Sequence, residues 1–182
     1  GTLIGNIRRK GVRVDWLNIG GGLGIVYNKE KPQTAARFAK AVIPLVRKIN
    51  VRLILEPGRF IAGNSGILVA KVTYVKKTRS KNFVIADAAM NDLLRPSLYD
   101  AYHEILPVIR RPVRKKILAD VVGPICESGD VLARDRKLPE FQPGELIAVM
   151  GAGAYGFTMS SNYNSRPRAA EVMVIRGKFH VV

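Results

Sequence analysis

The first 55 residues are arranged as strand, helix and strand, and this order limits the possible folds more than any other feature. Residues 12–19 are predicted to form a strand that stops at the glycine cluster of residues 20–24. Residues 51–55 form a second short apolar strand. Between the strands, apolar side chains recur at helical spacing, at Phe38, Ala41, Val42, Leu45, Val46 and Ile49. A proline at position 44 interrupts this predicted helix. This order predicts a parallel crossover unit.

Such a unit is incomplete by itself, because both faces of a parallel sheet need cover. Two strands and one helix do not provide that cover. A complete (β/α)8 barrel takes about 250 residues, which is more than the 182 residues of this chain. We therefore expect residues 1–63 to be the carboxyl-terminal end of a barrel whose amino-terminal half is missing.

Residues 64–182 are predicted to be mainly β-structure. Strands are expected over residues 67–76, 83–87, 117–122 and 145–150, and a short helix within residues 91–101. Residues 171–182 are expected to form a hairpin that turns near Arg176 and Gly177. The fold class is thus α/β followed by a β-rich carboxyl-terminal domain.

The chain is strongly basic, with 30 Lys and Arg against 14 Asp and Glu and a net charge of +16. Basic residues gather at positions 8–10, 76–81 and 110–116, as in a nucleic-acid binder, a protein that attracts small anions, or ordinary solvated faces. Aromatic residues are not interspersed in these runs, which disfavours binding of single-stranded nucleic acid.

The sequence also bears on where the protein is located. No apolar run approaches the length of a membrane span, which is about 20 residues. A single cysteine cannot form an internal disulfide, so we expect a cytoplasmic protein.

Two candidate sites follow the two strands of the first 63 residues. Glycines at the end of a parallel strand let backbone N–H groups close on a phosphate, which is the functional interpretation of Gly20, Gly21 and Gly22; a plain tight turn is the alternative. A dinucleotide site is disfavoured because Ile25 breaks the G-x-G-x-x-G pattern. The segment Glu56-Pro57-Gly58-Arg59 ends the second strand, where catalytic groups of barrels gather, although a surface ion pair would look the same.

Three further motifs lie in the β-rich region. They are the segment Arg95-Pro96-Ser97-Leu98-Tyr99, the only cysteine with its neighbour in Cys126-Glu127-Ser128-Gly129-Asp130, and the turn from Gly151 to Gly156 that contains Tyr155. Glycine, proline and serine surround Cys126, which predicts an exposed loop. His103 and His180 lack ligand-like spacing and are expected on a helix surface and in the hairpin, so no metal site is predicted.

Together these five motifs, in this order, resemble the diaminopimelate decarboxylases over essentially the whole chain. That family is similar in fold to alanine racemase and the eukaryotic ornithine decarboxylases. The resemblance implies a (β/α)8 barrel that binds pyridoxal 5'-phosphate, a following β-domain, and a homodimer with active sites at the interface. It also implies decarboxylation of meso-2,6-diaminopimelate to L-lysine in lysine biosynthesis.

The resemblance assigns a role to each motif. Gly20, Gly21 and Gly22 would hold the cofactor phosphate, and Glu56 would pair with the pyridine nitrogen. Tyr155 and the backbone of Pro57, Gly58 and Arg59 would add phosphate contacts. The substrate would be held by Arg59, Arg95, Tyr99, Glu127 and Tyr155. Cys126 would act as a proton donor that arrives from the partner subunit.

The choice of substrate follows from the charges. Diaminopimelate carries a distal carboxylate as well as a distal ammonium, which suits Arg95 beside Glu127, because arginine binds carboxylates bidentately.

The chain departs from the family pattern at two points. Ala89 stands where the family is expected to have glycine. The setting of the family's cofactor-binding lysine is absent, so the isolated chain is predicted to be inactive. Alternatives are a related ornithine- or arginine-type decarboxylase and a basic nucleic-acid-binding β-protein.

Overall fold

A computed structural model describes residues 2–109 and 114–182, which separate into two compact units, Gly1–Ile61 and Ala62–Val182. The elements of the first unit are α1 (Thr2–Arg9), β1 (Trp16–Asn18), α2 (Ala35–Ile49) and β2 (Arg52–Ile54), and α3 (Gly58–Ala62) follows them. The basic run at residues 110–116 lies partly outside the described residues.

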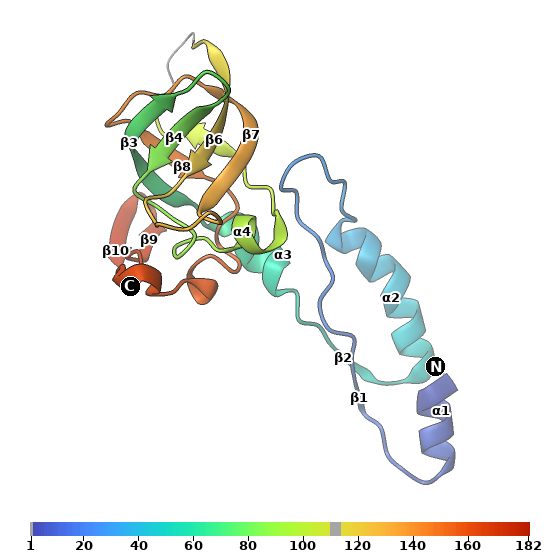
Figure 1. Ribbon diagram of the computed structural model, residues 1–182. Coiled ribbons are helices and arrows are strands. Elements are labelled where there is room, and N and C mark those ends of the chain that lie inside the picture. The colour runs from blue at the N-terminus through green and yellow to red at the C-terminus, as the bar shows by residue number, and fades with distance from the viewer. Residues whose placement is uncertain (1, 110–113) are drawn as a thin grey trace. The chain divides into compact units, whose positions relative to one another are not determined.

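The first unit is the predicted parallel crossover. Strand β1 pairs with β2 in parallel, with Leu17 opposite Leu53, and α2 connects them (Figure 1). Helix α2 begins where the Thr34 hydroxyl accepts a hydrogen bond from the Arg37 N–H at 3.2 Å. It ends at Asn50, which has a left-handed φ of 51°. Pro44 lies inside the helix without ending it.

The first strand is shorter than the predicted residues 12–19. The carbonyl of Val14 accepts a hydrogen bond from the Arg8 side chain at 2.6 Å rather than from a neighbouring strand. The partner strand begins only at Arg52, whose N–H donates to the Asp15 carbonyl at 2.7 Å, so the pairing does not extend to the residues before Asp15. Availability of a partner therefore sets the length of this strand.

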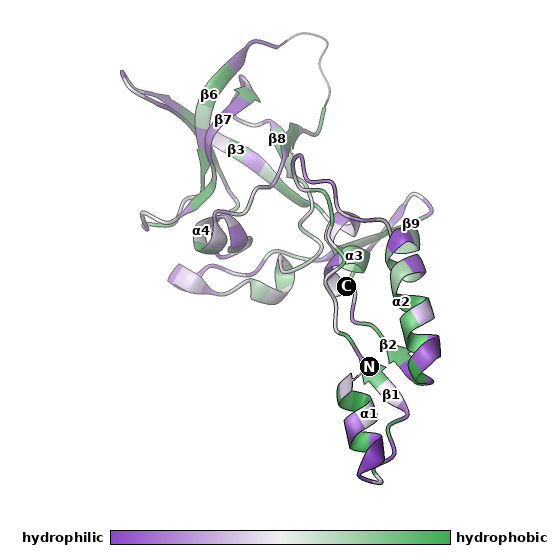
Figure 2. Ribbon diagram, turned by 90° about the vertical axis from the view of Figure 1, so that its right-hand side faces the viewer, coloured by the Kyte–Doolittle hydropathy of each residue, from purple (hydrophilic) through white to green (hydrophobic). Residues whose placement is uncertain are grey.

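The first unit buries little apolar surface. Among its described residues the buried hydrophobic side chains are Ile4, Leu23 and Ile25. Hydrophobic and hydrophilic segments alternate along α2 (Figure 2), but none of its residues is buried. Ile54 and Leu55, at the end of β2, are each 39% exposed, as expected for a parallel pair without full cover.

The second unit is built on a six-stranded sheet with the order β5-β8-β3-β4-β6-β7. Its strands are β3 (Leu68–Lys77), β4 (Asn82–Ala86), β5 (Ile105–Pro107), β6 (Lys116–Val122), β7 (Val131–Pro139) and β8 (Leu146–Val149). All neighbours are antiparallel except β4 and β6. The edge strands β5 and β7 contact each other, so the sheet curves toward a closed barrel (Figure 1).

The interior of this curved sheet is a continuous apolar core. Val72, Val84, Val121 and Ile147 are fully buried, and Phe141 is 1% exposed. These side chains come from β3, β4, β6 and β8 and from the segment after β7, so the core joins distant parts of the chain. At about 25 cal/mol per Å² of buried apolar surface, such a core is the main source of stability.

The predicted strands and the hairpin are confirmed, with boundaries shifted by one or two residues. The short helix is α4 (Arg95–Tyr99), and the hairpin is β9 (Val172–Ile175) with β10 (Lys178–Val181), turning at Arg176 and Gly177. Strands β5 and β7 were not predicted. No helix within residues 2–109 and 114–182 is long and apolar enough to cross a bilayer.

Candidate functional site

In the first unit, the ends of β1 and β2 bring the glycine cluster and Glu56 together. Asn18, the last residue of β1, donates from Nδ2 to Glu56 Oε1 at 2.5 Å and accepts from the Gly20 N–H at 2.7 Å. The Glu56 N–H donates to the Gly20 carbonyl at 2.8 Å. One amide side chain thus fixes both the turn and the carboxylate, a role that sequence reasoning missed.

The glycine turn depends on glycine at three positions. Gly20 and Gly22 have φ of 68° and 98°, a region that other L-residues rarely adopt. A Cβ on Gly21 would lie 2.6 Å from the Glu56 carbonyl oxygen, so only glycine fits there. The space around Gly20 and Gly22 is open. A phosphate fits this turn, and Glu56 is an exposed carboxylate suited to a ring N–H.

The rest of the Glu56 motif forms a tight turn into α3. The Gly58 N–H donates to the Glu56 carbonyl at 2.9 Å, and the Ile61 N–H donates to the Pro57 carbonyl at 3.0 Å. Gly58 and Arg59 are exposed. The structure therefore keeps Glu56, Pro57, Gly58 and Arg59 in one turn at the end of β2.

In the second unit, Cys126 and Glu127 lie on an exposed loop that a buried carboxylate anchors. Asp130 is 3% exposed and accepts from the Met90 N–H and the Ile125 N–H, each at 2.7 Å. Burial raises the pKa of Asp130, although these two hydrogen bonds act in the opposite direction. The loop is thus rigid at its base while the Cys126 thiol is exposed, as predicted.

Close packing beneath the loop explains its glycine. A Cβ on Gly123 would lie 2.5 Å from Asp130 Oδ2 and 2.6 Å from the Cα of Ala89. Ala89 is itself fully buried. The alanine at position 89 is therefore compatible with the loop, provided that position 123 has no side chain.

Helix α4 is attached to the same loop. The Ser97 hydroxyl donates to the Gly129 carbonyl at 2.5 Å, which links the segment holding Arg95 and Tyr99 to the segment holding Cys126 and Glu127. Tyr99 is 63% exposed and Arg95 only 9% exposed. Four of the predicted substrate-contacting and catalytic residues thus come from two connected elements.

The expectation that His103 lies on a helix surface is wrong. His103 is fully buried, its Nδ1 is 2.9 Å from the Met150 carbonyl oxygen, and its Nε2 is 3.1 Å from Arg95 Nη1. A carbonyl only accepts, so Nδ1 carries the proton and the Nε2 lone pair receives the Arg95 N–H. Burial, with the charges of Arg95 and Arg136, lowers the pKa of His103. A neutral histidine therefore holds the Arg95 guanidinium.

The turn after β8 presents Tyr155 in a strained conformation. Tyr155 has φ of 63° and is 47% exposed. A Cβ on Gly153 would lie 2.0 Å from the Ala62 carbonyl oxygen, and one on Gly156 would lie 2.3 Å from that of Ala152. Close packing therefore requires glycine at positions 153 and 156. At position 155 a glycine would relieve the backbone strain, but the residue there is tyrosine.

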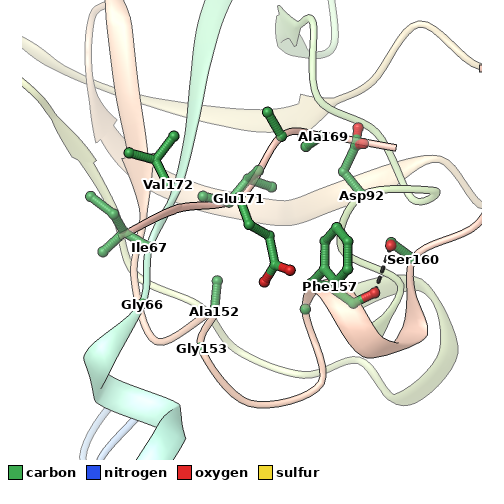
Figure 3. Close-up of a pocket in the computed structure, with 13 residues that line it drawn as sticks. Gly66, Ile67, Asp92, Ala152, Gly153, Phe157, Ser160, Ala169, Glu171 and Val172 are labelled. Atoms are coloured by element: carbon green, nitrogen blue, oxygen red, sulfur yellow. Dashed lines mark hydrogen bonds between the residues drawn. The ribbon is translucent and has the colours of Figure 1, made fainter. Parts of the chain in front are cut away.

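A pocket of about 180 Å³ lies beside this turn (Figure 3). Phe157, Ile67 and Val172 form apolar walls, and the Glu171 carboxylate points into it. None of the predicted site residues lines this pocket. Within the described residues, no group of three or more His, Cys, Asp or Glu side chains could hold a metal ion.

Comparison with known proteins places this geometry in one family. The family described as "Pyridoxal-dependent decarboxylase, C-terminal sheet domain" matches residues 24–153. A diaminopimelate decarboxylase of Aquifex aeolicus is 51% identical over all 182 residues, and one of Vibrio cholerae is 50% identical. The chain covers 43% of each of these relatives, so it spans less than half of their length.

Solved structures agree with the sequence relatives. A crystal structure from Aquifex aeolicus matches 99% of this chain with a TM-score of 0.95 and 51% identity, and the chain covers 45% of it. Diaminopimelate decarboxylase of Helicobacter pylori, complexed with L-lysine, matches 99% of the chain at TM-score 0.91 and 39% identity, with 44% of that protein covered. The fold and the family match show that this chain belongs to the pyridoxal-dependent decarboxylases.

Proposed function

We propose that this chain is the carboxyl-terminal part of a diaminopimelate decarboxylase that converts meso-2,6-diaminopimelate to L-lysine. Relatives named diaminopimelate decarboxylase share about half of the amino acids of this chain, which supports this activity. The observation that carries it is the exposed Cys126-Glu127 pair on a loop fixed by buried Asp130. A packing role would bury the thiol, whereas a role toward substrate needs it accessible on a rigid support.

Pyridoxal 5'-phosphate fits the residues of this chain that would hold it. The open glycine turn at Gly20, Gly21 and Gly22 would receive the phosphate, and Tyr155, which is 47% exposed, would donate a further hydrogen bond from its hydroxyl. Glu56, oriented by Asn18, would accept a hydrogen bond from the protonated pyridine nitrogen and so keep that nitrogen protonated. When bound, the cofactor supplies an electron sink for the charge that remains when CO₂ leaves.

The substrate would be recognised at both of its ends. Arg59, Arg95 and Tyr99 are donors suited to carboxylates, and Glu127 is suited to the distal ammonium. His103 beside Arg95 is neutral, so the Arg95 guanidinium carries the only charge of this pair. Cys126 would deliver a proton to the substrate carbon after CO₂ has left, since a thiol can donate near neutral pH. We further propose a cytoplasmic homodimer in which Cys126 serves the partner's site.

Catalysis also needs a lysine that carries the cofactor, and this chain lacks the sequence setting of that lysine. We therefore expect activity only when the chain is joined to the amino-terminal portion of a relative such as the Aquifex aeolicus enzyme. This fusion is called the joined enzyme below. The joined enzyme should release CO₂ from diaminopimelate, and borohydride should trap a lysine of the added portion.

The isolated chain is the control and should do neither. Substituting Cys126→Ala in the joined enzyme should lower kcat while KM stays nearly constant, because a proton donor is removed and not a binding contact. A joined enzyme that binds the cofactor but decarboxylates ornithine rather than diaminopimelate would overturn the proposed substrate. A lysine of this chain trapped together with CO₂ release from the isolated chain would overturn the proposed division of roles.

A further inference from the structure

The Glu127 carboxylate has a partner that no sequence motif indicated. Tyr163 donates from its hydroxyl to Glu127 Oε2 at 3.2 Å, across 36 residues of sequence. The other oxygen, Oε1, accepts from the Gly129 N–H at 3.3 Å. With one donor on each oxygen the plane of the carboxylate is defined. Each oxygen keeps lone-pair capacity for a ligand, because a carboxylate has about four acceptor sites.

The turn that carries Tyr163 is strained. Its next two residues, Asn164 and Ser165, have φ of 56° and 57°, and neither is glycine. Consecutive left-handed residues are uncommon, and they persist only where the surrounding structure holds them. The chain thus adopts an unfavourable backbone at the point where the Tyr163 side chain leaves it.

A buried asparagine holds the two ends of this turn. Asn91 is 1% exposed; its carbonyl accepts from the Ser161 N–H at 2.9 Å and its Nδ2 donates to the Ser161 carbonyl at 3.3 Å. On the other side of the turn, Arg166 donates from Nε to Asn91 Oδ1 at 3.2 Å and from Nη2 to the Asp87 carbonyl at 2.5 Å. Asn162 Nδ2 donates to the Arg166 carbonyl at 2.8 Å, closing the turn. The position of Tyr163 is therefore set by hydrogen bonds on both sides of the turn that end at the buried Asn91.

From this geometry we propose that Tyr163 is a positioning residue, which orients the Glu127 carboxylate toward the distal ammonium group of the substrate. The inference deepens the proposed function and rests on the role proposed there for Glu127. The hydrogen bond to Glu127 also raises the pKa of Tyr163, with a smaller contribution from the charge of Glu127. The phenol is thus kept protonated and remains a donor.

The test uses the joined enzyme and two substrates that differ only at the far end. Diaminopimelate carries the distal ammonium, and 2-aminopimelate has the same carbon chain without it. Tyr163→Phe keeps the ring and removes the donor. We expect its KM for diaminopimelate to rise about tenfold, as for the loss of a hydrogen bond to a charged group, with kcat and the kinetics of 2-aminopimelate unchanged. Tyr74→Phe, at an exposed position on β3, is the matched control and should change neither substrate.

A double-mutant cycle separates positioning from a general structural role. In a Glu127→Gln background, Tyr163→Phe should have little further effect, because the carboxylate that it orients is gone. If Glu127→Gln impairs diaminopimelate selectively but Tyr163→Phe does not, the inference is overturned and the proposed function stands. If Tyr163→Phe lowers kcat equally for both substrates, it acts elsewhere and the inference is overturned. If the joined enzyme decarboxylates neither substrate, the proposed function itself fails.

One readout does not depend on activity. In the isolated chain, ¹³C-labelled tyrosine followed by NMR through a pH titration should show that the Tyr163 phenol ionises at higher pH than the ordinary value of 10.0. Tyr163→Phe should remove that signal, and Glu127→Gln should return it toward the ordinary value. A Tyr163 signal that does not respond to Glu127→Gln would show that the hydrogen bond does not form, which would overturn the inference.

Discussion

The two units of the molecule have different sources of order. In the second unit, six strands enclose a core that runs through β3, β4, β6 and β8. In the first unit, β1 and β2 pair over three residues each, and α2 buries none of its side chains. Hydrogen bonds between exposed groups, such as those of Asn18 and Arg8, hold the first unit instead. A sheet that curves upon itself can supply its own core, whereas a parallel pair depends on further cover.

The difference also separates the two kinds of candidate site. Glu56 and the glycine turn are held by local contacts in the thinly packed unit. Arg95, Cys126 and Glu127 are held by contacts that end in buried groups, namely His103 and Asp130. We therefore expect the proposed cofactor-binding residues of the first unit to need the rest of the enzyme for order, and the proposed substrate-binding residues of the second unit to be ordered already.

The largest expected effect is on the core of the second unit. Phe141→Ala should lower the free energy of unfolding by about 3–5 kcal/mol, because it removes a fully enclosed ring. Phe60→Ala in α3, where the ring is 41% exposed, is the control and should cost less than about 1 kcal/mol. Urea unfolding followed by far-UV circular dichroism measures both. Similar losses for the two variants would contradict the proposed difference between the units.

The second largest effect is expected for Asp130→Ala, which should lower the free energy of unfolding by about 2–3 kcal/mol, because two buried backbone N–H groups lose their acceptor.

The contribution of Asp130 to stability in the wild-type chain also depends on pH. Burial raises the pKa of Asp130 above its ordinary 3.8, so folding favours the protonated form. The contribution of Asp130 to the free energy of unfolding is therefore fully present below pH 3.8, and it is lost as the pH rises through the pKa of the folded state. Asp130→Asn should remove this loss. An unchanged pH profile in Asp130→Asn would show that Asp130 is not the group responsible.

A smaller effect is expected at His103, about 1 kcal/mol for His103→Gln at pH 7.5. Here the sign is opposite, because burial lowers the pKa of His103 below its ordinary 6.5. Its contribution is present above pH 6.5 and is lost as the pH falls through the folded pKa, since the unfolded chain then binds the proton more readily. His103→Gln should remove this loss, whereas His180→Gln in the exposed hairpin should retain it. Urea unfolding between pH 7.5 and 5 distinguishes the two variants.

The smallest effect on stability is expected in the first unit. Asn18→Ala should cost less than about 1 kcal/mol, because the bonds to Glu56 and Gly20 join exposed groups. In the joined enzyme, however, it should weaken binding of pyridoxal phosphate several-fold, since the carboxylate loses its orientation. A cofactor titration followed by absorbance measures this. A large loss of stability with unchanged cofactor affinity would reverse the role given to Asn18.

Sequence reasoning found the strands whose apolar residues alternate but missed β7. That strand contains Arg134, Asp135, Arg136 and Lys137 in succession, which locally resembles a solvated loop. It is a strand because β6 offers it a partner, and because buried Asp120 accepts the Asp135 N–H at 2.7 Å where Asp135 has a φ of 47°. Both causes are tertiary and leave no local pattern.

The prediction of the candidate site has the same limit. Motifs of several adjacent residues drew attention to Glu56, Arg95, Cys126 and Tyr155, whose roles stay predictions. Single residues that contact distant partners were not singled out. Asn18 contacts a residue 38 positions away, and His103 contacts one 47 positions away. An asparagine two residues before the glycine turn was a usable signal, whereas a lone histidine after α4 was not.

Hydrogen exchange of individual backbone amides tests the contrast between the units most directly. In the isolated chain, we expect the amides of β3, β4, β6 and β8 to be protected and those of β1 and β2 to exchange quickly. In the joined enzyme, β1 and β2 should become protected as well, and pyridoxal phosphate should add protection at Gly20, Gly21 and Gly22. Amides of β1 and β2 that are as protected in the isolated chain as those of β3 and β4 would contradict the account.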